Sequence, residues 1–120
     1  KRFQQNARNG GQAETPVEIT IWGKGEKPTL LNDSTGAKLK LISQLPTGDV
    51  LKVNTDPAAL SVTVTHADGT VESGYGLLDP ETSIAGFTLR AGDNNLRYVP
   101  DGDGSATVIQ AAWYDRYEGV

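Results

Sequence analysis

The stretch SVTVTHADGTVESG, residues 61–74, decides the fold. Val62 and Val64 alternate with serine and threonine, and HADG at 66–69 follows directly. A period of two with β-branched residues is typical of a strand with one buried face, and an Asp-Gly pair favours a tight chain reversal. The stretch therefore predicts an antiparallel β-hairpin.

The same period-two alternation recurs along the chain, and turn signals separate its occurrences. The alternating segments lie at residues 17–22, 38–42, 50–54, 87–90, 96–99 and 106–117. The turn signals are NDSTG at 32–36, TGD at 47–49, AGDNN at 91–95 and DGDG at 101–104. Strand centres about 8 to 12 residues apart suit a sandwich or a barrel, and 14 Gly and 6 Pro leave no long helical period. We therefore expect an all-β fold, an antiparallel two-sheet β-sandwich with jelly-roll or galectin-like topology.

The chain is long enough for one domain with a sizeable core, since it has 120 residues. Residues 1–13 are polar and carry two adjacent glycines, so they predict a flexible linker or arm. The sandwich domain is expected over residues 14–120. Its predicted core comprises Val17, Ile19, Ile21, Leu39, Leu41, Val53, Val62, Val64, Phe87, Leu89, Leu96 and Ile109.

Composition and charge exclude several classes of partner. Cysteine is absent, which removes disulfides and thiol chemistry. No apolar run approaches the length of a membrane helix, so no membrane partner is expected. Residues 1–52 carry eight Lys and Arg against five Asp and Glu, whereas residues 53–120 carry three against ten. The acidic second half would repel phosphates and argues against nucleic acid as a partner.

Candidate catalytic and metal-binding residues are few. His66 is the only histidine, and its place at a hairpin turn indicates a solvated turn residue. DGDGS at 101–105 begins like a calcium loop, but Ala106 and Ala112 stand where that loop needs Gly and Glu. A tight acidic turn explains it better, and calcium bound by this turn together with another acid stays open. The remaining carboxylates fall mostly in turns, so a hydrolase is the weakest hypothesis, and we expect no catalytic residue, cofactor or metal.

Aromatic residues offer a binding surface instead. Trp22, Tyr75, Trp113 and Tyr114 are the candidate contacts with a glycan or a protein partner. Exposed aromatic rings can stack on sugars, yet large aromatics in a small β domain more often fill a core or an interface. Core packing, a subunit interface and a sugar platform all stay open, and a stand-alone carbohydrate-binding module is the alternative function.

Three stretches, taken in order, resemble the C-terminal domain of siphophage distal tail proteins. They are PVEITIWGKGEKPTLLNDSTGAKLKL at 16–41, GDVLKVNTDPAALSVTV at 48–64 and LLDPETSIAGFTLRAGDNNLRYVPDGDGSATVIQAAWYDRYEGV at 77–120. The shared patterns are PTLxNxxTG, FxLxxGxNxLR and a closing WxDRYxG. Tyr114 and Glu118 depart from the family pattern, which puts the packing neighbours of the last strand in doubt.

The resemblance implies a galectin-like sandwich with a non-enzymatic, structural role at the tail tip or baseplate of a phage or prophage. It implies a virion protein made in the cytoplasm of the bacterial host, whose partners are other phage tail proteins. A separate N-terminal domain would form a hexameric ring, while this domain alone would be a monomer. Residues 1–12 would be the linker from the ring. Contact with a cell-surface carbohydrate of the host is a further expectation.

Overall fold

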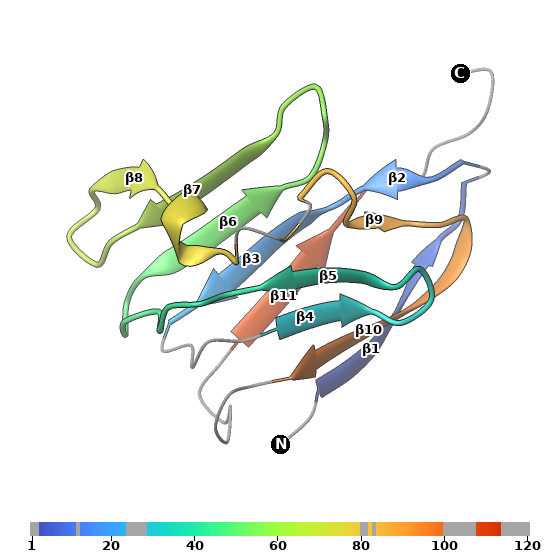
Figure 1. Ribbon diagram of the computed structural model, residues 1–120, viewed down its shortest axis with the longest axis horizontal. Helices are drawn as coiled ribbons and strands as arrows, with labels where there is room; N and C mark the ends of the chain where they lie inside the picture. The colour runs from blue at the N-terminus through green and yellow to red at the C-terminus, as the bar shows by residue number, and fades with distance from the viewer. Residues whose placement is uncertain are drawn as a thin grey trace.

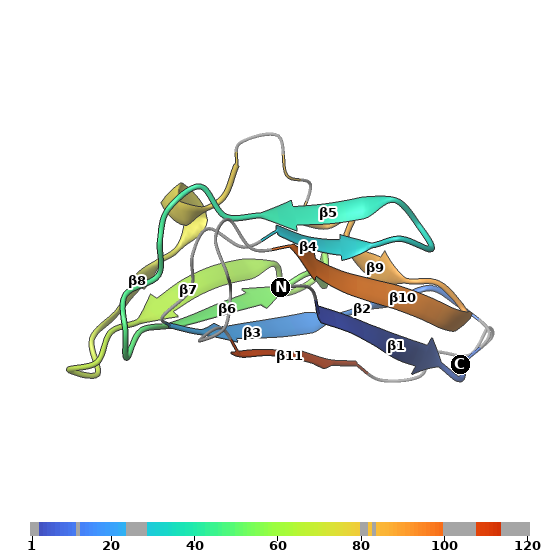
Figure 2. The same ribbon diagram turned by 90° about the horizontal axis from the view of Figure 1, so that it is seen from below.

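The computed structural model describes residues 3–11, 13–23, 29–79, 82, 84–99 and 108–113. These residues form an all-β fold in which every strand pair is antiparallel. Two sheets lie one above the other as two layers (Figures 1 and 2). The predicted antiparallel sandwich is therefore confirmed. Among the described residues, none belongs to a helix with the length and apolar content needed to cross a bilayer.

The first layer is a four-stranded sheet with the strand order β1-β10-β4-β5. Its strands are β1 (Phe3–Asn9), β10 (Gly92–Val99), β4 (Thr29–Asn32) and β5 (Ala37–Lys40). The turn between β4 and β5 contains Gly36 at φ +80°, a left-handed conformation that glycine adopts without steric cost. The sequence signal NDSTG therefore marks a β-hairpin turn.

The second layer is a five-stranded sheet with the strand order β11-β3-β6-β7-β8. Its strands are β11 (Val108–Ala112), β3 (Glu18–Trp22), β6 (Val50–Asn54), β7 (Ser61–Thr65) and β8 (Val71–Ser73). A short pair of β2 (Thr15–Pro16) and β9 (Thr88–Leu89) forms a third sheet. A single turn of 3₁₀ helix, η1 (Tyr75–Leu77), follows β8.

The hairpin predicted from residues 61–74 is present as β7 and β8. The amide of His66 donates to the carbonyl of Thr70 at 2.8 Å, and the amide of Gly69 donates to the carbonyl of His66 at 2.9 Å. Gly69 has a φ of +91°, so its lack of a side chain is what permits the turn. The Asp-Gly signal thus locates the reversal correctly.

The core lies between the two layers and matches the predicted core closely. Eleven of the twelve predicted residues are buried, and Ile109 is half-buried and packs against them. Phe87 has the largest fully buried side chain among the described residues, and replacing such a residue by alanine typically costs about 3–5 kcal/mol of stability. Further buried residues not in the prediction include Leu30, Leu45, Leu51, Leu78 and Tyr98.

The prediction of a flexible arm over residues 1–13 is wrong for Phe3–Asn9. This segment forms β1 and pairs with β10 from Phe3 opposite Tyr98 to Asn9 opposite Gly92. The polar sequence hides the strand because the ladder is made by backbone groups, which carry no residue signature. The only apolar side chain that the described part of β1 buries is that of Ala7. The sandwich therefore begins earlier than the predicted boundary at residue 14.

Candidate functional site

The aromatic candidates do not form one platform in the described residues. Trp22 ends β3 and is half-buried, Tyr75 lies in η1 and is 47% exposed, and Trp113 directly follows β11. β11 and β8 are the opposite edges of the five-stranded sheet, which separates Trp113 from the region of Tyr75. Trp22 pairs with Val108, at the end of β11 remote from Trp113. Tyr114 lies outside the described residues.

Trp22 instead belongs to a line of side chains that crosses the outer face of the five-stranded sheet. Residues directly opposite each other in an antiparallel pair lie on the same face. In each of the four strand pairs, one residue lies directly opposite a residue of the next strand, so these residues form a continuous line across the sheet. We call this line the apolar row, and in strand order it comprises Val108, Trp22, Val50, Thr65 and Val71.

The apolar row is open to solvent at both ends. Val108 is 58% exposed and Val71 is 61% exposed, while the three central residues are half-buried. With strands about 4.8 Å apart, the row extends for roughly 19 Å across the sheet. Four of its five members are apolar, and none is charged. An uncharged line that is apolar except at Thr65, with a tryptophan as its second member, has the composition of the core of a protein interface.

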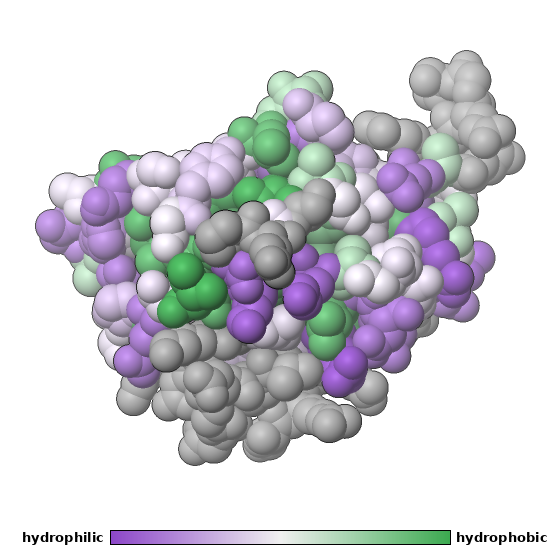
Figure 3. Space-filling view, viewed as in Figure 1, coloured by the Kyte–Doolittle hydropathy of each residue, from purple (hydrophilic) through white to green (hydrophobic). Residues whose placement is uncertain are grey.

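The outer face of the four-stranded sheet is different, because charged residues dominate it. Arg97 donates from Nε and Nη2 to the two carboxylate oxygens of Asp33 at 2.8 and 3.1 Å. Lys38 and Lys40 on β5 are exposed. In Figure 3, which views this side of the molecule, hydrophilic residues gather mainly toward the right, and hydrophobic residues lie near η1 and at several other places. The outer face of the five-stranded sheet therefore presents apolar side chains to a partner, whereas that of the four-stranded sheet presents charged side chains.

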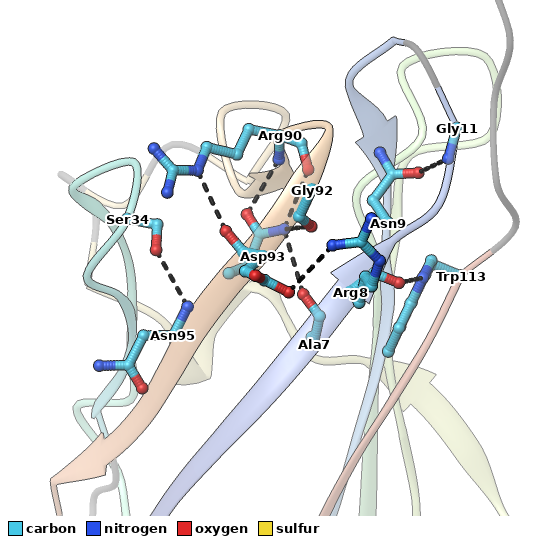
Figure 4. A network of polar contacts seen from close by, with 11 residues as sticks. Ala7, Arg8, Asn9, Gly11, Ser34, Arg90, Gly92, Asp93, Asn95 and Trp113 are labelled. Atoms are coloured by element: carbon cyan, nitrogen blue, oxygen red, sulfur yellow. Dashed lines mark hydrogen bonds and ion pairs between the residues drawn. The ribbon is translucent and has the colours of Figure 1, made fainter.

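Trp113 joins the two layers at their shared side. Its Nε1 donates to the carbonyl of Arg8 on the edge strand β1 at 3.2 Å, and its ring lies beside that residue (Figure 4). The Arg8 side chain itself forms an ion pair with Asp93 at 3.3 Å. The tryptophan packs against the core while its N–H satisfies a backbone carbonyl, which is a usual arrangement for a half-buried indole. Trp113 is thus partly buried against the core, and its role as a contact with a partner or a glycan stays a prediction.

Three fully buried asparagines of the described residues, Asn9, Asn32 and Asn94, hydrogen-bond to neighbouring chain segments, and we call them the asparagine latch. Asn32 Nδ2 donates to Asn94 Oδ1 at 3.0 Å and lies 3.1 Å from the carbonyl of Thr88. Asn9 Nδ2 donates to the carbonyls of Ala13 at 2.8 Å and Leu89 at 3.3 Å. The latch therefore ties β1, β4, β9 and β10 together from inside the fold.

Asn94 is the centre of the latch. Its Nδ2 lies 3.2 Å from the carbonyl of Ala7, 2.9 Å from that of Arg90 and 3.1 Å from that of Gly92, and its Oδ1 also accepts from the amide of Arg90 at 3.0 Å. Figure 4 shows these backbone groups converging beside β10. Buried polar groups are tolerated where such partners satisfy them. The asparagines of the PTLxNxxTG and FxLxxGxNxLR patterns are thus structural residues that meet each other.

His66 is more constrained than the predicted solvated turn residue. Its Nδ1 lies 2.9 Å from Asp49 Oδ2, and its Nε2 lies 3.0 Å from Glu72 Oε1. The hydrogen bond to Glu72, and to a smaller extent the one to Asp49, raises the pKa of His66 above its ordinary value. The prediction missed these contacts because Asp49 is 17 residues away in the chain. The only sequence signal was the turn that places Glu72 across the hairpin.

No cluster of metal-ligating residues is present within the described ranges. The two carboxylates around His66 face opposite ring nitrogens, so they do not converge on one point. The acidic turn at residues 101–105 lies outside the described ranges, and the interpretation of it as an acidic turn stays a prediction.

One protein-family model matches the chain over residues 10–117, and its description is siphovirus-type tail component, C-terminal domain. The matched range contains Trp22, Trp113 and both asparagines of the motif patterns. No curated protein and no solved structure gives a significant match.

Proposed function

Since the chain belongs to the siphovirus-type tail component family, whose C-terminal domain it matches over residues 10–117, we propose that it is the outer domain of a distal tail protein at the tail tip of a phage or prophage. Membership makes it a structural tail component, with a place in the virion among other tail proteins. We further propose that it performs no catalysis and presents a surface on which neighbouring tail proteins assemble.

The apolar row is the contact surface that we propose for a neighbouring tail protein. Exposed apolar side chains are costly to leave in water, and burying them yields about 25 cal/mol per Å². A row of five residues is smaller than the roughly 800 Å² per partner of a stable interface. The row therefore needs neighbouring contacts, or repeated copies in an assembly, to hold a partner.

A ring-forming domain elsewhere in the full-length protein would supply those repeated copies. We propose that six copies assemble through that domain and that the sandwich carries no ring contact of its own. Light scattering of residues 1–120 alone is then expected to show a monomer. A stable hexamer of this fragment would contradict the division of labour.

Contact with host-surface glycans has narrower support. Tyr75 is the most exposed of the described aromatic candidates, and Trp22 is flanked on neighbouring strands by valines rather than by a second ring. Titration of tryptophan fluorescence with the cell-wall polysaccharide of the host tests the stand-alone carbohydrate-binding module. A saturable change in fluorescence that is lost in Trp22→Ala would support glycan binding. A fluorescence spectrum that the polysaccharide leaves unchanged would count against glycan binding.

Surface variants test the protein contact. Val71→Lys and Val108→Lys place a charge at either end of the row, at positions exposed enough to leave the fold intact. The matched control is Asn95→Lys on the outer side of the four-stranded sheet, where Asn95 is also exposed. Complementation of a phage lacking the protein should yield few complete particles with the row variants and normal numbers with the control. Equal assembly by all three variants would overturn the proposed surface.

A further inference from the structure

His66 links the edge strand β8 to the segment just before β6, two parts of the chain that strand β7 separates. Asp49 directly precedes β6, and Glu72 lies in the middle of the edge strand β8. His66 follows β7 and stands between them, with one carboxylate at each ring nitrogen at 2.9 and 3.0 Å. The side chain of Asp49 is only 9% exposed, so this carboxylate is fixed, whereas that of Glu72 is 60% exposed.

The two contacts require a particular protonation state. An ionised carboxylate only accepts hydrogen bonds, whereas a neutral imidazole carries one donor and one acceptor nitrogen. A neutral ring could therefore donate to Asp49 or to Glu72, and its other nitrogen would face a carboxylate oxygen with no hydrogen between them. Only the imidazolium form satisfies both contacts at once.

We propose that His66 is a proton-dependent clasp, which in its imidazolium form fastens the edge strand β8 to the segment before β6 and on losing its proton releases β8. The edge position of β8 makes this effective. β8 has three residues, all exposed, and among the described strands it pairs with β7 alone. Short, exposed elements of this kind occupy the low-stability end of a fold and open locally.

The charges around the ring agree with this role. Besides Asp49 and Glu72, Asp68 in the hairpin turn interacts electrostatically with His66. Hydrogen bonds from Thr70 lower the pKa of Asp68, and the His66 charge adds a smaller contribution. Removing the proton from His66 would leave these three carboxylates without the cation among them, which adds repulsion to the lost hydrogen bond.

The direction of the pH effect follows from the raised pKa of His66. Its stabilising contribution is complete below the ordinary value of about 6.5 and is lost as the pH rises through the higher pKa of the folded state. β8 should therefore be most firmly held in mildly acidic solution. Val71 lies on β8 next to Glu72, so release would also displace one end of the apolar row. This last consequence rests on the proposed function, whereas the clasp itself does not.

An NMR titration of the isolated 120-residue chain tests the clasp directly. The sequence contains one histidine, so the ring resonances belong to His66 without further assignment. The midpoint should lie above about 6.5 in the wild type and fall in Glu72→Gln and in Asp49→Asn. A wild-type midpoint at or below 6.5, or one unmoved by both variants, would overturn the proposal.

Hydrogen exchange tests the release of the strand. After correction for intrinsic exchange rates, protection of the β8 amides and of Gly74 should fall at least about threefold between pH 6 and pH 8.5, with that of β3 unchanged. His66→Gln removes the titrating group, and circular dichroism verifies its fold. Its β8 protection should not depend on pH. An equal decrease in wild type and variant would refute the clasp, and no part of this test involves a partner protein.

Discussion

Asn32 Nδ2 donates to Asn94 Oδ1 across 3.0 Å in the interior of the protein, and both residues are fully buried. Asn32 ends β4 and Asn94 lies near the start of β10, strands separated by more than fifty residues of chain. The side chain of Asn94 also reaches backbone groups of β1 and of the turn before β10. A single amide therefore stabilises the packing of three chain segments, and substitution at this residue should be costly.

Asn94→Ala is expected to lower the free energy of unfolding by about 3 kcal/mol or more, since each buried group left unsatisfied costs about 1–3 kcal/mol. Its neighbour Asn95 is exposed, and Asn95→Ala should change stability by less than about 0.5 kcal/mol. Urea unfolding followed by circular dichroism measures both variants. A loss below about 1 kcal/mol in Asn94→Ala would show that the asparagine latch is not a main support of the fold.

Gly23 directly follows β3, where another part of the backbone passes very close. A Cβ at this position would lie 1.9 Å from the carbonyl oxygen of Pro46, which is backbone and cannot rotate away. Gly23→Ala should therefore destabilise the protein by at least about 2 kcal/mol. A Cβ on Gly76 meets nothing within 4 Å, so Gly76→Ala is the matched control and should be nearly neutral. Equal melting temperatures for the two variants would contradict this packing.

Trp113→Phe keeps an aromatic ring but removes the N–H that donates to the Arg8 carbonyl. We expect a loss of about 1 kcal/mol from the hydrogen bond, with faster exchange of the β1 amides because β1 is less firmly joined to β11. Arg8→Ala retains the carbonyl and removes only an exposed ion pair, which is worth at most about 1 kcal/mol. If β1 exchange rises equally in both variants, the indole hydrogen bond is not the relevant contact.

The Asp33–Arg97 pair gives an acid dependence of stability. Hydrogen bonding from Arg97 lowers the pKa of Asp33 below 3.8. A carboxylate with a lowered pKa stabilises the folded state at pH values above its ordinary pKa. That contribution is lost as the pH falls through the pKa of the carboxylate in the folded state. The wild type should thus be more stable than Asp33→Asn at pH 7, and the difference should shrink as the pH falls through the lowered pKa of Asp33. Glu18→Gln, at an exposed carboxylate on β3, controls for charge loss and should show a smaller difference.

Period-two alternation was sufficient to predict the sandwich, the hairpin of residues 61–74 and nearly the whole core. These features depend on apolar side chains pointing to one face, which a sequence records directly. The jelly-roll or galectin-like topology stays a prediction. The ordered series of motifs also indicated the tail-component family, and the match to the family model over residues 10–117 confirms it. Asn32 and Asn94 were recognised as members of two sequence patterns, but the hydrogen bond between them was not predicted.

β1 and the His66 contacts could not be predicted in the same way. β1 is made by backbone pairing of polar residues, and His66 meets a carboxylate far away in sequence. The apolar row depends on the register of five strands, which fixes that Val108, Trp22 and Val71 share one line. Each residue alone is unremarkable, so the surface becomes visible only when the pairing is known.

We propose that this tail domain contacts its neighbours through the outer face of the five-stranded sheet. An electron cryomicroscopy reconstruction of the assembled tail tip tests it most directly. We expect Trp22, Val71 and Val108 to be buried against another tail protein while Lys38 and Lys40 on the opposite face stay in solvent. A reconstruction in which the row faces solvent and the four-stranded sheet carries the contacts would contradict the account.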